Sequence, residues 1–313
     1  MSEYVRIAAI DIGSDTVHLL IADVTASSDG PLVSDIEQLG ELIELGRRVA
    51  TMGQVGKRAA TRLETSLNRY LRLARRKSDR VVIGATEALR RATDGPALVE
   101  RLSEDLGEPV RVLSGAREAA LGLAGAVHRL DPVGSQLLID SGGASTELTL
   151  TDGHRRVASA SLPVGAALLG AEVRGDPPEA LSWAMAGARI GSALSLAPAG
   201  NPARAWATGG SAHNLAGLER IKGCAGDQRL TMAELSVLAA RLLADPARKL
   251  ARRSGEDLAR VEILPPGLLI IAAILAHYGL KDLTVVPEGL REGMIAATFE
   301  DGDAWWQDPP PNG

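Results

Sequence analysis

Cysteine and aromatic residues are scarce in this sequence of 313 residues, and their scarcity limits what the protein can be. Its one cysteine, Cys224, excludes an intrachain disulfide and any metal site built from several cysteines. Aromatic residues make up only 3%, with a single Phe, so the core must consist mainly of Leu, Val, Ile and Ala. Apolar residues still reach 45%, and such a chain is expected to fold as one large globular domain or two of ordinary size.

The sequence also lacks a long apolar segment. The longest apolar run covers nine residues, 268–276, which is too short to cross a bilayer. The N-terminal residues reach the charged Asp11 too early for a secretory signal. A net charge of −5 makes a dedicated nucleic-acid binder a poor expectation. Together these features predict a cytoplasmic protein that binds neither membrane nor nucleic acid.

Several motifs of known enzymes are missing as well. Residues 53–58 lack the spacing and the following Ser or Thr of a Walker loop. The sequence has no His-Glu-x-x-His and no Gly-x-Ser-x-Gly. A hydrolase with a histidine-bound metal and a serine esterase are therefore not expected.

Positive charge is concentrated between residues 47 and 91, where 13 Lys and Arg accompany three acidic residues. Residues 57–77 have apolar side chains at helical spacing, so we expect an amphipathic helix there. The opposite face of this helix carries an arginine stripe formed by Arg58, Arg62, Arg69, Arg72 and Arg76. Such a stripe is usually a solvated outer face. The alternative is a track for a polyanion, because arginine pairs with phosphate oxygens.

Two predicted β-hairpins with related turns form an internal repeat. Strands are expected at 5–12 and 17–24 around a turn at 13–15, and at 136–140 and 146–150 around a turn at 141–144. Both hairpins contain Ile-Asp-x-Gly with a hydroxyl residue one to three positions later, and the two aspartates lie 129 residues apart. This spacing suggests two related halves. Because strands alternate with helices along the rest of the chain, the sequence predicts an α/β protein.

Each turn places a carboxylate beside backbone N–H groups and hydroxyls, which suits a phosphate neutralised by a divalent cation. One such turn is ordinary hairpin chemistry, but two in related halves favour phosphate binding. Other strand-to-helix turns add to this pattern. The turn at 208–210 can present N–H groups to an anion. Thr86 is expected to cap a helix that contains Arg90. Glu118 lies in the first turn of a predicted helix. It either takes part in the chemistry or only stabilises the helix through its dipole.

Together these segments resemble the exopolyphosphatase and guanosine pentaphosphate phosphohydrolase (Ppx/GppA) family of the actin-like ATPase superfamily. The matches follow the family's order from Ile10 to Met294. Residues 10–20 resemble its first phosphate loop, and residues 140–147 resemble its second, D-I-G-G-G-S-T-E. Residues 113–119 are similar to I-S-G-x-E-E-A, 85–90 to A-T-S-A-L-R, and 161–166 to S-L-P-L-G-A.

The resemblance implies two ribonuclease-H-like domains with the site in the cleft between them. The first is expected to comprise residues 1–121 plus 290–304 and the second residues 122–289, with a disordered tail at 305–313. The implied reaction releases terminal phosphate from inorganic polyphosphate with Mg²⁺ or another divalent cation. Glu118 would be the catalytic base, and Asp11, Asp140 and Glu147 would hold the cation. The implied phosphate-binding residues are Gly13, Ser14, Asp15, Thr16, Arg90, Gly142, Gly143, Ser145, Thr208, Gly209 and Gly210.

Two departures from the family pattern keep other functions open. Asp15 replaces an Asn and adds a carboxylate beside the phosphates, and Arg117 replaces a Glu and adds a cation next to the proposed base. Both favour a sensor that binds a phosphate ligand without turnover. The alternative enzyme hydrolyses guanosine pentaphosphate, a (p)ppGpp-type ligand, or a nucleoside triphosphate. The chain stops where longer members add an HD-type region, which is typical of a short two-domain member, and the resemblance also suggests a homodimer.

Overall fold

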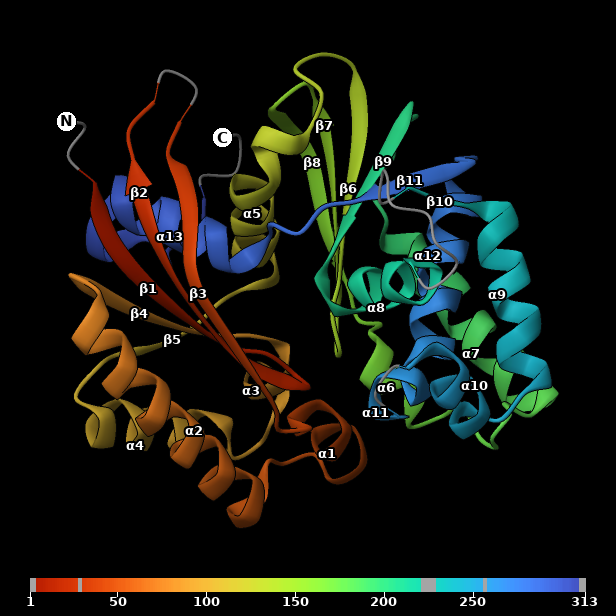
Figure 1. Cartoon of the computed structure of the whole chain (residues 1–313), viewed down its shortest axis with the longest axis horizontal. Coiled ribbons are helices and arrows are strands. Elements are labelled where there is room, and N and C mark those ends of the chain that lie inside the picture. Colours follow the sequence, from red (N-terminus) through yellow and green to blue (C-terminus); the bar gives the residue numbers. More distant parts are fainter. Residues whose placement is uncertain (1–3, 28–29, 221–228, 256–257, 310–313) are drawn as a thin grey trace. The chain divides into compact units, whose positions relative to one another are not determined.

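The computed structural model describes residues 4–27, 30–220, 229–255 and 258–309 (Figure 1). The contacts divide the chain into two compact units. Unit 1 comprises Met1–Val127 and Glu288–Gly313, and unit 2 comprises His128–Pro287. The boundaries expected from the sequence were 121/122 and 289/290. The lone cysteine, Cys224, lies outside the described residues.

A five-stranded sheet forms the centre of unit 1. Its strands are β1 (Val5–Ile12), β2 (Thr16–Thr25), β3 (Leu32–Leu42), β4 (Arg80–Ala85) and β5 (Val110–Val112). In the order β3-β2-β1-β4-β5, β1 to β3 pair antiparallel, whereas β1, β4 and β5 pair parallel. This strand order is that of a ribonuclease-H-like domain, as expected.

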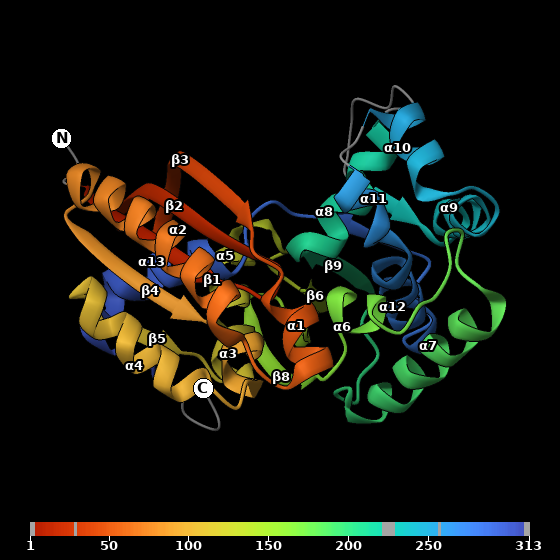
Figure 2. The same cartoon turned by 90° about the horizontal axis from the view of Figure 1, so that it is seen from below.

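Helices cover both faces of this sheet (Figure 2). They are α1 (Leu45–Met52), α2 (Gly56–Lys77), α3 (Glu87–Arg91), α4 (Gly95–Leu106), α5 (Gly115–Ala126) and α13 (Leu290–Asp301). Side chains of β1 alternate between the faces: Ile10 packs with α2, whereas Ala9 packs with α5 and α13. By the same alternation, Asp11 lies on the face of α5 and α13.

Two glycines fix the distance between α5 and α13. A Cβ on Gly125 would lie 1.9 Å from the carbonyl oxygen of Gly289, and a Cβ on Gly293 would lie 1.8 Å from that of Leu121. The backbones of the two helices are therefore in direct contact, and no larger residue fits at either position. This contact holds α5, which carries Glu118, at a defined place on the sheet.

Unit 2 repeats this topology. Its strands are β6 (Ser135–Ser141), β7 (Thr146–Asp152), β8 (Arg155–Leu162), β9 (Arg204–Thr208), β10 (Arg229–Thr231) and β11 (Asp282–Val285). In the order β10-β11-β9-β6-β7-β8, the strands β6, β7, β8, β9 and β11 take the places of β1 to β5. The internal repeat predicted from the two hairpins is thus confirmed.

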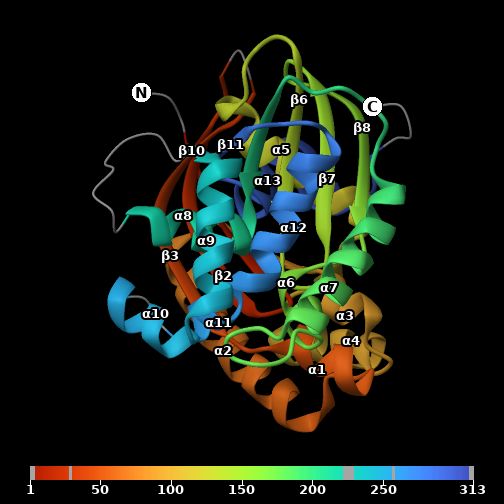
Figure 3. The same ribbon diagram turned by 90° about the vertical axis from the view of Figure 1, so that its right-hand side faces the viewer.

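The helices of unit 2 pack on the sheet face that carries Leu137 and Ile139 (Figure 3). They are α6 (Ala166–Gly170), α7 (Ala180–Ala193), α8 (Gly209–Arg220), α9 (Met232–Ala244), α10 (Ala247–Ser254), α11 (Leu258–Glu262) and α12 (Leu264–His277). Asp140 belongs to the opposite face, because it follows Ile139 in the strand. Within the described residues, no helix combines the length and apolar character needed to span a bilayer.

The end of the chain departs from the sequence prediction. A short 3-10 helix, η3 (Gly302–Ala304), follows α13, and the next residue, Trp305, is only 4% exposed. Trp305 belongs to the hydrophobic cluster that also contains Leu113 and Leu121. The prediction of a disordered tail from residue 305 is therefore wrong for Trp305, because this side chain belongs to the core. Residues 310–313 lie outside the described part.

Candidate active site

The two predicted phosphate loops have the same backbone geometry. In loop 1, residues 13–16, the N–H of Gly13 donates to the carbonyl of Thr16 over 3.0 Å. In loop 2, residues 142–145, the N–H of Gly142 donates to the carbonyl of Ser145 over 3.1 Å. Each loop follows a strand that ends in the shared Ile-Asp sequence. The related sequences thus form the same turn in both units.

Hydrogen bonds from residues at the start of α1 hold loop 1 in place. The carbonyl of Asp15 accepts hydrogen bonds from the N–H groups of Ile43 and Glu44, at 2.7 and 2.9 Å, and the carbonyl of Ser14 accepts from Gly46 at 2.6 Å. In a trans peptide the carbonyl and the following N–H point in opposite directions. The N–H groups of Asp15 and Thr16 therefore point away from α1, where they can donate to an anion.

Loop 2 is held by α6 in the same way. The carbonyl of Gly142 accepts from the N–H of Ala166 at 3.0 Å, and the carbonyl of Gly143 accepts from Ala167 and Leu168 at 2.8 and 3.0 Å. The N–H groups of Gly143 and Ala144 thus point away from α6. Successive N–H groups with a common direction form the concave anion sites known as nests. Each unit therefore has one loop suited to phosphate oxygens.

Asp15 combines burial with an unfavourable charge environment. Its side chain is half-buried, and its pKa rises from 3.8 to about 6 because of burial first and of Glu44 second, against a smaller opposing effect of Arg47. Glu44 and Arg47 both lie at the start of α1, which loop 1 contacts. At pH 7 the Asp15 carboxylate opposes anion binding by the neighbouring N–H groups.

Replacing Asp15 with Asn is expected to raise the melting temperature at pH 8 but to change it little at pH 4. A raised pKa means that the folded state binds the proton more tightly than the unfolded state does. Stability is therefore lost as the pH rises from about 4 through 6. Thermal melts at both pH values check this, with the exposed Asp105→Asn as control. An equal shift at both pH values would contradict it.

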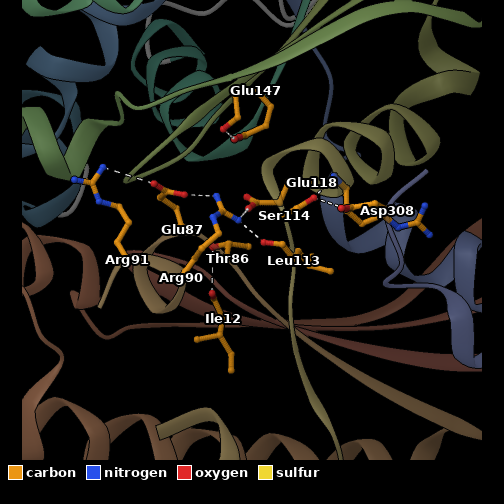
Figure 4. Close-up of polar contacts among 12 residues, drawn as sticks. Ile12, Thr86, Glu87, Arg90, Arg91, Leu113, Ser114, Glu118, Glu147 and Asp308 are labelled. Atoms are coloured by element: carbon orange, nitrogen blue, oxygen red, sulfur yellow. Dashed lines mark hydrogen bonds and ion pairs between the residues drawn. The ribbon is translucent and has the colours of Figure 1, made fainter. Parts of the chain in front are cut away.

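Arg90 and Glu118 form an ion pair in unit 1 (Figure 4). The Nη1 of Arg90 lies 2.5 Å from Oε1 of Glu118, and the same guanidinium donates to the carboxylate of Glu87 and to the carbonyl of Leu113. Burial lowers the pKa of Arg90, but Glu118 and Glu87 outweigh it, and the net pKa is raised. These contacts use three of the five N–H donors of the guanidinium, so two are left for a ligand.

The prediction that Glu118 lies in a first helical turn is confirmed. Glu118 lies in the first turn of α5 and is only 6% exposed. The hydroxyl of Ser114 caps this helix by accepting the N–H of Arg117 at 3.0 Å. The predicted capping role of Thr86 is wrong, because its hydroxyl donates instead to the carbonyl of Ile12 at 3.3 Å. That bond ties the start of α3 to the end of β1.

Asp140 and Glu147 are directly opposite each other in the β6–β7 hairpin. Side chains in such a pair lie on the same face, with Cβ atoms roughly 4.5–5.5 Å apart. Glu147 is only 5% exposed, and its Oε1 accepts a hydrogen bond from the hydroxyl of Ser161 at 2.7 Å. Two neighbouring carboxylates provide the oxygen ligands that Mg²⁺ prefers. The residues present thus fit a divalent cation.

The other predicted metal ligand, Asp11, belongs to unit 1, where it lies opposite His18. The ring Nε2 of His18 is 2.7 Å from the hydroxyl of Thr16 in loop 1. No group of three His, Cys, Asp or Glu suited to a metal ion is found among the residues that the structure describes. A cation site that includes Asp11 therefore stays a prediction.

The third predicted anion turn lies at the C-terminal end of β9, an interior strand of the unit 2 sheet. β9 ends at Thr208, which pairs with Asp140, and α8 begins at Gly209. The structure thus brings the 208–210 turn next to the strand that leads into loop 2. Its N–H groups open a helix of 12 residues, which favours negative charge at this end.

Arg117 does not occupy the place that the sequence suggested. Its guanidinium donates to the carbonyl of Trp305, with Nε at 2.7 Å, and its Nη2 is 3.6 Å from Asp301. Arg90, in contrast, contacts the carboxylate of Glu118 directly. Sequence analysis missed this arrangement, because Arg117 and Trp305 are 188 residues apart and the tail was expected to be disordered.

Known proteins share both the sequence pattern and the fold. The sequence model of the Ppx/GppA phosphatase family matches residues 20–300. A member of that family from Aquifex aeolicus has a TM-score of 0.79 at 26% identity, over 96% of this chain and 99% of that chain. The structure described as the Aquifex aeolicus PPX-GPPA enzyme has a TM-score of 0.77 at 26% identity, and the match covers 94% of this chain and 100% of that chain. An exopolyphosphatase from Cytophaga hutchinsonii has the same fold, with a TM-score of 0.81 at 22% identity over 95% and 98%.

Proposed function

Because the chain belongs to the Ppx/GppA phosphatase family, and is thus a hydrolase of phosphoanhydride bonds, we propose that its substrate is inorganic polyphosphate. The observation that carries the proposal is the pair of loops with matching hydrogen bonds, one in each unit, each preceded by an aspartate. Such loops bind phosphate oxygens without contacts to a base or a sugar. The Cytophaga hutchinsonii protein, described as an exopolyphosphatase, is consistent with this substrate.

In this proposal, backbone N–H groups of residues 13–16 and 142–145 and of the 208–210 turn bind phosphate oxygens. The oxygen of a water molecule attacks the terminal phosphorus, and Glu118 accepts a proton from that water. The bridging P–O bond breaks, and its electron pair stays on the oxygen of the shortened chain. Arg90 orients Glu118 and offers its two remaining donors to the phosphate. Positioning and charge neutralisation supply most of the rate, as is usual for phosphoryl transfer.

The acidic residues Asp140 and Glu147, together with Asp11, are proposed to hold Mg²⁺ or another divalent cation. When bound, the cation neutralises the charge of the phosphate oxygens. The hydrogen bond from Ser161 fixes the orientation of the Glu147 carboxylate, so this ligand is oriented before the cation arrives.

A phosphate-release assay tests the proposal. Polyphosphate, guanosine pentaphosphate and ATP are compared under the same conditions, with Mg²⁺ and with a chelator. We expect the highest kcat/KM for polyphosphate and loss of activity with the chelator. A higher kcat/KM for guanosine pentaphosphate or ATP would show that polyphosphate is not the preferred substrate. Binding of polyphosphate without any release of phosphate would make the protein a sensor.

The arginine stripe of α2 gives a prediction about substrate length. Arg58, Arg72 and Arg76 are exposed, whereas Arg62 donates to the carbonyl of Leu42 and Arg69 pairs with Glu41. If the exposed guanidinium groups bind the distal polyphosphate chain, changing all three to Gln raises KM for long chains more than for short ones. The salt dependence of binding also becomes weaker, because fewer counterions are released.

The control for this variant is the triple change of Arg62, Arg69 and Arg75 to Gln. Arg75 pairs with Glu108, so all three control residues already have partners within unit 1. The control removes the same charge and is expected to change KM less. Equal effects of the two variants, or no effect, would make the stripe an ordinary solvated face.

A further inference from the structure

The C-terminal segment of unit 1 contacts the start of α5 at three points. The carbonyl of Trp305 accepts the guanidinium of Arg117, Asp301 lies 3.6 Å from the same guanidinium, and Asp308 accepts the hydroxyl of Ser114 (Figure 4). We call residues 301–308 the C-terminal clamp. Ser114 is the N-cap of α5 and Arg117 directly precedes Glu118, so the clamp holds the turn that carries the proposed base.

The clamp is built into the core, which distinguishes it from a loose surface contact. Trp305 belongs to the same buried hydrophobic cluster as Leu113, which precedes α5, and Leu121, which lies within α5. The Trp306 ring lies under the guanidinium of Arg111, with 4.7 Å from Arg111 Cζ to the ring centroid. Both the strand that leads into α5 and the helix itself therefore contact the same C-terminal residues.

Arg117 is the central residue of this contact. It is only 8% exposed, and a buried guanidinium is costly unless its N–H groups are bonded. Burial lowers its pKa, and Asp301 acts against that decrease. A carbonyl that receives both Nε and Nη2 fixes the plane of the guanidinium, which a lysine could not achieve. Fixing Arg117 also restricts the adjacent residue, Glu118.

We infer that Arg117 and the C-terminal clamp are positioning elements that set the orientation of Glu118 together with Arg90. Glu118 is then held by an ion pair at its carboxylate and by the clamp through its backbone. Arg117 then has a role in the reaction without touching the substrate. The inference rests on the proposed function, because it assumes that Glu118 is the base.

The test compares Arg117→Met, Asp308→Ala and the control Arg6→Met in phosphate release from polyphosphate. Methionine resembles the unbranched apolar stem of arginine but lacks the N–H donors of the guanidinium. We expect Arg117→Met to lower kcat about 10-fold to 100-fold with KM unchanged, because a small displacement of a catalytic group is that costly. Asp308 is exposed, so Asp308→Ala is expected to fold and to show a smaller decrease in kcat. Arg6 pairs with Asp23 on β1 and β2, and its loss is expected to lower stability without lowering kcat.

A double-mutant cycle with Glu118→Gln separates positioning from a merely structural role. If Arg117 acts through Glu118, Arg117→Met lowers kcat in the wild type but changes it little in Glu118→Gln. If Arg117→Met lowers kcat equally in the wild type and in Glu118→Gln, or if folded Arg117→Met has the kcat of the wild type, the inference about Arg117 is wrong. The proposed function would not be affected by either result. Wild-type activity of Glu118→Gln would instead overturn the proposed role of Glu118, and inactivity of the wild type would overturn the proposed function.

Discussion

Glu118→Gln is expected to lower kcat by about 10²–10⁴-fold and to leave KM little changed, because a general base contributes that much to the rate. Glutamine has nearly the same size and can still accept a hydrogen bond from Arg90 through its amide oxygen. It cannot take a proton from water. Steady-state phosphate release from polyphosphate at saturating substrate measures the decrease.

The structure offers a matched control in Glu87→Gln. Glu87 is a second carboxylate that accepts a hydrogen bond from the Arg90 guanidinium, and its side chain is also largely buried. Removing its charge disturbs Arg90 to a similar extent but leaves the proposed base in place. We expect a much smaller loss of kcat than for Glu118→Gln. Should Glu118→Gln retain turnover within a few-fold of the wild type, Glu118 is not the base.

Local sequence signals were sufficient to predict the two hairpins and their loops. Apolar runs of β1 and β6 end at an aspartate and a glycine, and each is followed by a returning strand with a clear pattern. The information that forms these turns is contained in a few adjacent residues. The same is true of Glu118, because its position in a first helical turn depends on residues that are its neighbours in sequence.

β3 was not predicted, and its residues explain why. Leu32, Ile36, Leu39 and Ile43 are spaced three or four residues apart, which is typical of a helix. β3 is the edge strand of its sheet and pairs only with β2 among the described strands, so most of its side chains are exposed. An edge strand without a buried face gives no clear alternation. Its pairing with β2 decides the structure, and that pairing is not visible in local sequence.

The role of the chain end could not be predicted for a related reason. Acidic residues and a proline run at 309–311 have the composition of a disordered tail. What orders the segment up to residue 308 is the fit of Trp305 into the core and the bonds to Arg117 and Ser114. These partners come from the other end of the unit's sequence. Long-range contacts of this kind therefore make a polar tail part of the folded unit.

Asp140→Asn and Glu147→Gln are expected to abolish most activity at low Mg²⁺ and to raise the Mg²⁺ concentration needed for half-maximal turnover. An amide is a poor substitute for a carboxylate as a Mg²⁺ ligand. Neither change is expected to unfold the protein, since Asn and Gln preserve shape and the new amide oxygen of Glu147→Gln can still accept the hydrogen bond from Ser161. Asp152→Asn, at the other end of the same hairpin, is the matched control, because it removes one negative charge from β7 without affecting the proposed ligands.

Thermal melts give a second readout that does not depend on activity. Two carboxylates directly opposite each other repel, so without metal each variant is expected to melt at or above the temperature of the wild type. A ligand that binds only the folded state adds stability, about 2.7 kcal/mol at a concentration 100 times its Kd. Added Mg²⁺ should therefore raise the melting temperature of the wild type and of Asp152→Asn but not of Asp140→Asn or Glu147→Gln. If Mg²⁺ stabilises all four proteins equally, the paired carboxylates of the β6–β7 hairpin do not hold the cation.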